Sequence, residues 1–138
     1  QEVLLPKTNK VIGIQRTKTP DELVGLYSEA DVFINPTLED NFPTTNIEAL
    51  ACGTPVVTFR TGGSVEVITS ETGFAVAKGD MEGLLSAIQT VLANGKMHYR
   101  AACKKKAERD YNKDIQYGKY IKLYQQIMSE SNYGKTTF

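Results

Sequence analysis

The chain has 138 residues, of which 41% are apolar and 23% charged, as expected of one soluble globular domain with a real core. Sixteen basic side chains balance sixteen acidic ones, so the zero net charge argues against broad electrostatic binding to nucleic acid or to an anionic membrane. Two cysteines and one histidine provide neither a disulfide framework nor a metal-ligand spacing, so we expect free thiols in a reducing compartment.

The first predicted elements are two strands that flank a helix. The apolar run at residues 11–14 predicts a strand. Thr19 and Glu22 match a capping box around Pro20, which suits the first helical position. Four apolar residues at helical spacing share one face of this helix: Leu23, Leu26, Tyr27 and Ala30. The apolar run at residues 31–35 predicts a strand that is covered on both faces.

The middle of the chain continues this alternation of strands and helices. Pro43 predicts the start of a helix that runs to about Cys52, and Gly53 is a natural stop. Residues 55–59 predict a second buried strand. A glycine turn and a short helical turn then separate it from a further strand at residues 73–76.

Helices are expected in the last part of the chain. Asp80 can cap the first of them, a second covers residues 99–108, and a third runs from about residue 114 to residue 128. The basic stretch at residues 104–109 is interpreted as a solvated face. The last segment, residues 130–138, is expected to fray. Four tyrosines are expected to form a packing stripe: Tyr111, Tyr117, Tyr120 and Tyr124.

This order of elements predicts an α/β fold, a Rossmann-like parallel sheet with helices on both faces, formed by residues 1–138 as one domain. In such sheets the ligand binds beyond the carboxyl ends of the strands. The loop at residues 40–45 and the glycine loop at residues 61–64 each follow a predicted strand. We therefore expect both loops at the binding edge.

The helix that Pro43 opens carries groups suited to a phosphate. Its first amides have no intrahelical partner, and together with the helix dipole they favour an anion. The hydroxyls of Thr44 and Thr45 add donors, although a plain helix cap is the alternative. Glu48 lies one turn further on the same face, where its carboxylate can accept bonds from the diol of a ribose. The alternative for Glu48 is an ordinary solvent-facing glutamate.

Three further positions lie beside this helix start. Asp40 can bind sugar hydroxyls, or it can be an Asx-turn residue beside Asn41. Gly62 and Gly63 remove side chains and allow a close approach of backbone to a ligand, although most such pairs are only turns. Arg60 lies next to this glycine pair and can reach a phosphate, or it is a surface charge.

The segment "DVFINPTLEDNFPTTNIEALACGTPVVTFRTGGSVEVI" resembles the nucleotide-sugar-binding half of the retaining glycosyltransferases with the GT-B fold, called glycosyl transferases group 1. The mark of that family is an acidic residue, seven residues and then Glu, followed by a segment such as "ALACGTPVV" and a Gly-Gly loop. Here the two acids are Asp40 and Glu48. The resemblance covers roughly residues 11–93.

The resemblance implies an enzyme that moves a sugar from a nucleotide diphosphate sugar to an acceptor with retention, in polysaccharide or glycoconjugate assembly. It implies that Asp40, as the catalytic residue, contacts hydroxyls of the donor sugar and that Glu48 holds the ribose. No metal and no cofactor are expected, because protein donors neutralise the leaving diphosphate. The substrate-binding residues that it implies are Asn41, Phe42, Pro43, Thr44, Thr45, Glu48, Gly62 and Gly63.

The chain departs from the family pattern in two respects. The first acid is usually Glu, so Glu39 is the alternative to Asp40 for that position. The acceptor domain and the first strands, with their basic pair, have no match before residue 11. We therefore expect an incomplete half of a GT-B fold, inactive alone, with an irregular sheet edge at residues 32–34 that a second copy can complete.

The expected partners are the nucleotide sugar and, through the missing domain, an acceptor saccharide or lipid-linked saccharide, but no nucleic acid. Without a leader or an apolar stretch of ~20 residues, the expected location is the cytoplasm, with the inner face of the membrane as the alternative. Two other functions stay open: a related nucleotide-sugar epimerase, and a non-enzymatic α/β interaction domain.

Overall fold

The computed structural model describes residues 12–131, and its centre is a parallel sheet of three strands in the order β1–β2–β3. The strands are β1 (Phe33–Asn35), β2 (Val56–Phe59) and β3 (Gly73–Val76). Phe33 lies opposite Val56, which in turn lies opposite Gly73. Because all three strands run in the same direction, their carboxyl ends meet at one edge of the sheet. The predicted α/β, Rossmann-like class is confirmed.

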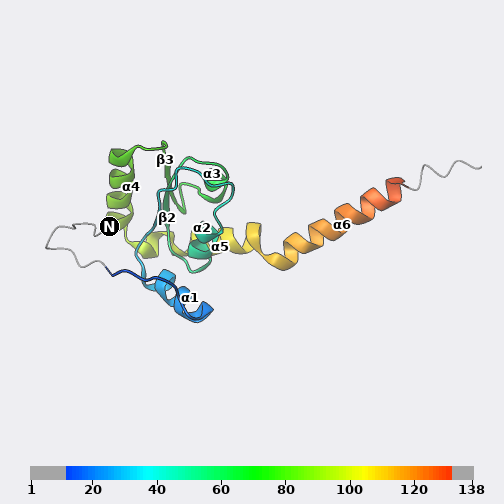
Figure 1. Cartoon of the computed structure of the whole chain (residues 1–138), viewed down its shortest axis with the longest axis horizontal. Helices are drawn as coiled ribbons and strands as arrows, with labels where there is room; N and C mark the ends of the chain where they lie inside the picture. Colours follow the sequence, from blue (N-terminus) through cyan, green and yellow to red (C-terminus); the bar gives the residue numbers. More distant parts are fainter. Residues whose placement is uncertain (1–11, 132–138) are drawn as a thin grey trace, which may run out of the picture.

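Helices cover both faces of the sheet, as predicted. In Figure 1, α4 lies on one side of β2 and β3, while α2 and α3 lie on the other side. α5 packs against α2, and α1 precedes β1. The helices of the described residues are α1 (Pro20–Glu29), α2 (Thr44–Ala51), α3 (Ser64–Val67), α4 (Met81–Asn94), α5 (Lys96–Tyr111) and α6 (Lys113–Ser131).

The predicted caps set the starts of α1 and α4. The Thr19 hydroxyl accepts a hydrogen bond of 3.2 Å from the Glu22 amide, but the Glu22 carboxylate accepts from the Lys18 amide, at 2.7 Å, and so forms no closed capping box. Asp80 accepts a bond of 2.8 Å from the Gly83 amide at the start of α4. These bonds satisfy amides that would otherwise lack partners at the helix starts.

The core lies between β2, the inner face of α2, and helices α4 and α5. Both cysteines are free thiols, as expected. Burial raises the pKa of the Cys103 thiol to about 12, so this thiol stays protonated and unreactive. The fully buried apolar side chains include Leu50, Val56, Val57, Val67, Val91 and Cys103.

The prediction for the first strand is wrong in its described part. Residues 12–14 form no strand, and Val11 lies outside the described residues. Within residues 12–131, β1 pairs only with β2 and is an edge strand, which agrees with the expected irregular edge. Ile34 is therefore 41% exposed, so this strand is not covered on both faces. A strand needs a hydrogen-bonding neighbour, and residues 12–14 find none among the described strands.

α6 extends away from the sheet and the other helices (Figure 1). Among the described elements, its main packing contact is with α5. Tyr117, Tyr120 and Tyr124 are 63%, 60% and 64% exposed, so the predicted packing stripe is wrong for these three. Helix geometry continues through Ser131, and residues 132–138 of the expected frayed tail lie outside the described residues. No helix in residues 12–131 combines the length and apolar character needed to cross a membrane.

Candidate functional site

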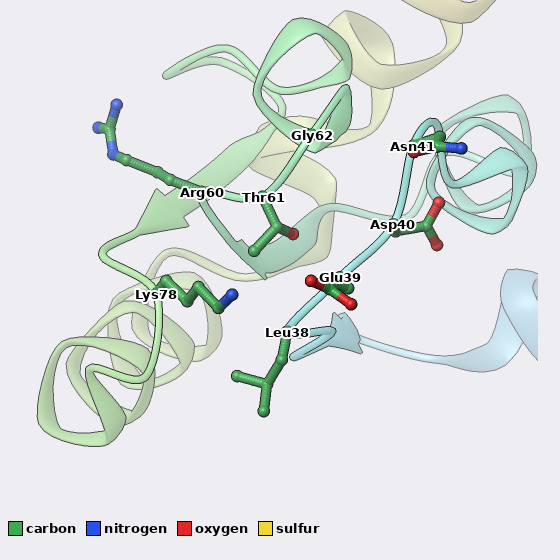
Figure 2. Close-up of a pocket in the computed structure, with 8 residues that line it drawn as sticks. All are labelled: Leu38, Glu39, Asp40, Asn41, Arg60, Thr61, Gly62 and Lys78. Atoms are coloured by element: carbon green, nitrogen blue, oxygen red, sulfur yellow. The ribbon is translucent and has the colours of Figure 1, made fainter.

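An open cleft of about 630 Å³ lies at the carboxyl ends of the strands. Each loop that follows a strand contributes to it, so the structure brings the two predicted loops together. Figure 2 shows the carboxylate of Glu39 and the ammonium group of Lys78 inside the cleft, while the Arg60 guanidinium points away from them. The lining residues are Leu38, Glu39, Asp40, Asn41, Arg60, Thr61, Gly62 and Lys78.

The two loops touch each other directly through the glycine pair. The Gly63 amide donates a hydrogen bond of 2.8 Å to the Asn41 carbonyl. A Cβ atom at Gly62 would lie 1.8 Å from the Asp40 carbonyl oxygen, and one at Gly63 would lie 2.3 Å from the Phe42 ring. Gly62 also has a φ of +44°, which side chains rarely adopt. The glycines therefore allow one loop to approach the other.

Asp40 adopts the Asx turn that the sequence left as an alternative. Its Oδ1 atom accepts a hydrogen bond of 3.0 Å from the Phe42 amide. This bond fixes the direction of the carboxylate and leaves its second oxygen for other partners. The Phe42 amide is thereby occupied within the loop, and only opening of the turn would make it available to a phosphate.

The start of α2 has few amides left for a ligand. Pro43 is buried and has no amide proton, and the Asn46 amide donates to the Pro43 carbonyl at 3.2 Å. No side chain caps α2, so the threonine hydroxyls do not serve the helix as a plain cap would require. The amides of Thr44 and Thr45, both on exposed residues, are the ones that an anion can reach.

A buried asparagine pair fixes α2 over the end of β1. The Asn35 side-chain amide donates a hydrogen bond of 2.9 Å to the side-chain oxygen Oδ1 of Asn46, and Asn46 is fully buried. Among the described residues, its Nδ2 atom is a buried group without a partner. Sequence reasoning missed this pair. The available signal was the helical spacing of Asn46, which shares a face with the apolar residues Ala49 and Leu50 three and four positions later.

Glu48 does not line the cleft. It is exposed on the side of α2 that faces α1, and its Oε2 atom accepts a hydrogen bond of 3.2 Å from the Tyr27 hydroxyl. Burial, followed by the charge of Glu48, raises the pKa of Tyr27 to about 12, so Tyr27 is a protonated donor at neutral pH. Glu48 is thus a solvent-accessible carboxylate with a fixed partner, one helical turn beyond Thr44.

The site is therefore spread along the start of α2 rather than gathered in one pocket. Asp40, Asn41 and Gly62 line the cleft, whereas Phe42, Gly63 and Glu48 lie outside its lining. Within residues 12–131, no group of three or more His, Cys, Asp or Glu side chains is placed to hold a metal ion.

Known proteins resemble this chain in sequence and in fold. The family model described as "Glycosyl transferases group 1" matches residues 4–110. A GDP-mannose-dependent alpha-(1-6)-phosphatidylinositol dimannoside mannosyltransferase of Mycobacterium tuberculosis is 35% identical over 86 residues, which cover 62% of this chain and 22% of that protein. The capsular polysaccharide biosynthesis glycosyltransferase CapM of Staphylococcus aureus is 26% identical over 132 residues, which cover 94% of this chain and 34% of CapM.

A solved structure agrees with these matches. Sucrose-phosphate synthase from Thermosynechococcus elongatus superposes with a TM-score of 0.70 at 32% sequence identity, covering 80% of this chain and 28% of that chain. The chain thus spans between 22% and 34% of the length of these three proteins.

Proposed function

This chain belongs to the family of glycosyl transferases group 1, as a part of a GT-B enzyme, and we propose that it binds the donor for transfer of a sugar from a nucleotide diphosphate sugar to an acceptor, with retention. One observation carries the proposal. The accessible amides of Thr44 and Thr45 lie between two oriented carboxylates, Asp40 in the cleft and Glu48 beside Tyr27.

In this proposal the diphosphate occupies the start of α2. The amides of Thr44 and Thr45 and the helix dipole supply positive potential without a charged side chain. When the bond to the anomeric carbon breaks, its electron pair stays with the diphosphate oxygen, and negative charge develops there. Donors that are already aimed at that oxygen stabilise the charge without reorganising. No metal takes part in the proposed step.

Glu48 is proposed to hold the ribose. The rise from Thr44 to Glu48 along α2 is about 6 Å, so a nucleotide can place its phosphates on the helix start and its ribose beside the next turn. A carboxylate accepts two hydrogen bonds from a vicinal diol, and such charge-assisted bonds are stronger than neutral ones. The Tyr27 hydroxyl supports this role because it orients the carboxylate while leaving it exposed.

Asp40 is proposed to contact the donor sugar in the cleft, whose volume of about 630 Å³ lies within the range of small-molecule sites. Its free carboxylate oxygen accepts from a sugar hydroxyl and so fixes the anomeric carbon relative to the leaving diphosphate. Glu39 lines the same cleft, but the Asx turn orients Asp40 specifically, so we assign the role to Asp40.

The acceptor is proposed to be a saccharide or a lipid-linked saccharide, bound by a part of the enzyme that this chain does not include. Two relatives support this class, since one is named for capsular polysaccharide biosynthesis and the other for a phosphatidylinositol dimannoside. Pairing of the open edge of β1 with a second copy stays a proposal as well.

Nucleotide titration of the ¹⁵N-labelled chain tests donor binding. GDP and UDP are added separately, and the amide signals of residues 40–48 are followed by NMR. We expect one of the two nucleotides to shift the Thr44 and Thr45 amides most strongly and the signals of α6 least. If millimolar concentrations of both leave Thr44 and Thr45 unmoved, the proposal is wrong.

A further inference from the structure

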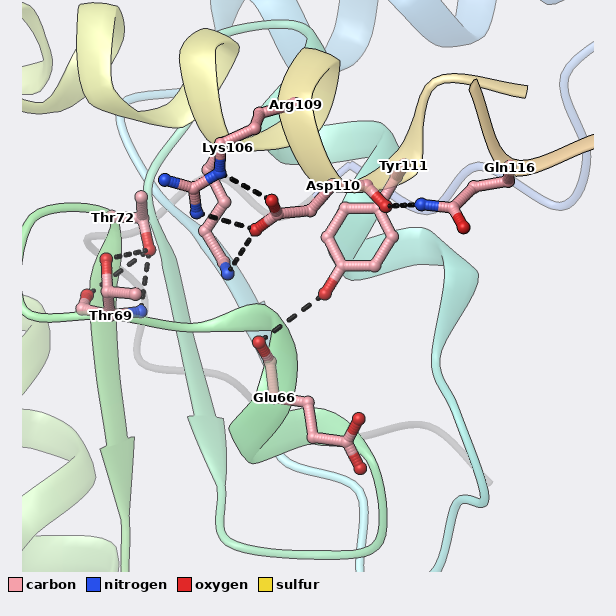
Figure 3. A network of polar contacts seen from close by, with 8 residues as sticks. All are labelled: Glu66, Thr69, Thr72, Lys106, Arg109, Asp110, Tyr111 and Gln116. Carbon is pink, nitrogen blue, oxygen red and sulfur yellow. Dashed lines mark hydrogen bonds and ion pairs between the residues drawn. The ribbon is translucent and has the colours of Figure 1, made fainter. Parts of the chain in front are cut away.

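Tyr111, the last residue of α5, contacts the loop after β1 and the helix α3 that follows the glycine loop. Its ring lies 6.1 Å from the Phe42 ring, centroid to centroid, at an interplanar angle of 58°. Its hydroxyl donates a hydrogen bond of 3.4 Å to the Glu66 carbonyl in α3 (Figure 3). One side chain from the C-terminal half of the chain therefore bridges the loop after β1 and the helix that follows the glycine loop.

The position of Tyr111 is itself fixed by a polar network. The Lys106 ammonium lies 5.8 Å from the centroid of the Tyr111 ring and forms an ion pair of 3.0 Å with Asp110. Arg109 pairs with the same carboxylate, and Figure 3 shows both cations around it. The Lys106 side chain is only 11% exposed, so it does not belong to the solvated face predicted for this basic stretch.

Phe42, which contacts Tyr111, is also hydrogen-bonded to Asp40. The Phe42 amide donates to the Asp40 carboxylate at 3.0 Å, and the Phe42 ring lies against the backbone of Gly63. The ring and this amide belong to the same residue, so contacts that hold the ring also restrict where the amide that orients Asp40 can lie. Tyr111 provides the aromatic surface that keeps the ring, which is 41% exposed, in place against Gly63.

We infer that Tyr111 is a positioning residue of the donor site, which acts through Phe42 to set the direction of the Asp40 carboxylate. The inference rests on the proposed function, because it assigns Tyr111 to the sugar end of the site. The named partners of Tyr111 at the site are the Phe42 ring and the Glu66 carbonyl, so we expect it to affect the sugar contact of Asp40 more than the diphosphate contact of Thr44 and Thr45.

The substitution Tyr111→Ala tests whether Tyr111 affects the sugar contact without affecting the diphosphate contact. Binding of a nucleoside diphosphate (GDP, UDP) and of the matching nucleotide sugar (GDP-mannose, UDP-glucose) to the chain is measured by titration calorimetry. We expect the variant to bind the nucleotide sugar about five- to tenfold more weakly than the unaltered chain, the range of one lost aromatic contact. Affinity for the nucleoside diphosphate should change by less than about twofold. A merely structural role would weaken both ligands alike.

Three further variants serve as controls. Tyr117→Ala removes a tyrosine that is 63% exposed on α6 and should leave both affinities unchanged. Tyr111→Phe keeps the ring and loses only the long bond to Glu66, so it should restore most of the affinity. Phe42→Ala removes the same contact from the other side, and its effect should not add to that of Tyr111→Ala.

The possible results distinguish the two proposals. If the unaltered chain binds neither nucleotide nor nucleotide sugar, both the donor-binding function and the role of Tyr111 are wrong. If the unaltered chain binds and Tyr111→Ala binds the nucleotide sugar equally well, only the role of Tyr111 is wrong. An equal loss for both ligands, with a lower melting temperature, would also overturn that role, since it would show a general loss of structure.

Discussion

The Gly63 amide and the Asn41 carbonyl are joined by a hydrogen bond of 2.8 Å, which links the loop after β1 to the loop after β2 at the edge of the sheet. This bond is possible because neither glycine beside it has a side chain to separate the loops. The geometry of Asp40 therefore depends on a residue of the next loop.

Gly62→Ala tests how tightly the loops must approach. The new Cβ would lie 1.8 Å from the Asp40 carbonyl oxygen at a φ of +44°, so backbone must move. Gly79→Ala is the matched control, because its φ is +81° but no atom lies within 4 Å of the new Cβ. We expect a loss of about 1–2 kcal/mol in the free energy of unfolding for Gly79→Ala and more than about 3 kcal/mol for Gly62→Ala, measured by urea denaturation. Equal losses would contradict the steric argument.

Glu48→Gln tests the ribose contact. The amide cannot accept two charge-assisted bonds from a diol, so we expect about tenfold weaker binding of the ribonucleoside diphosphate. A 2′,3′-dideoxy nucleoside diphosphate has no diol. Its affinity should therefore be lower than that of the ribonucleotide for the unaltered chain, and the variant should bind it with that same lower affinity. Calorimetry with the two ligands checks this, and an equal effect of the substitution on both would exclude Glu48 from the ribose site.

The Tyr27 hydroxyl should lose its proton only at a pH above the usual range for tyrosine. Its folded-state pKa is about 12, raised by burial first and then by Glu48, above the ordinary value of about 10. Because the folded-state pKa is the higher one, the contribution of Tyr27 to stability is complete below about pH 10 and is lost as the pH rises through about 12. Absorbance titration of the unaltered chain and of Tyr27→Phe gives the ionisation of Tyr27 by difference, and Tyr27→Phe should reduce the loss of stability over that pH range. Ionisation of Tyr27 at the ordinary value of about 10 would refute this.

Removal of α6 should leave the domain folded. A chain that ends after Gln116 keeps the bond of that side chain to the Asp110 carbonyl and the Asn112 cap. It loses helical residues that are exposed and contact little else. We expect the free energy of unfolding to change by less than about 0.5 kcal/mol, measured by urea denaturation. A larger loss would show that α6 packs on the domain in solution.

Local signals in the sequence were sufficient for most elements. Thr19 and Asp80 cap α1 and α4, and β3 begins and ends where its apolar run predicts. A cap bond, a glycine with positive φ or an apolar period involves residues a few positions apart, so each is present in the sequence itself. The segment from Asp40 to the Gly-Gly loop likewise predicts the family, and the match to the family model confirms it.

The tertiary structure alone decided how these residues are used. In the part of the chain that the structure describes, residues 12–14 have no paired neighbour and form no strand, and the tyrosines of α6 are exposed. The partners of Glu48 and Phe42 are Tyr27 and Tyr111, which lie far from them along the chain. Sequence determines what a segment can form by itself, because those interactions are local. Pairing, burial and the orientation of a carboxylate depend on which distant segment comes alongside, and only the folded chain settles that.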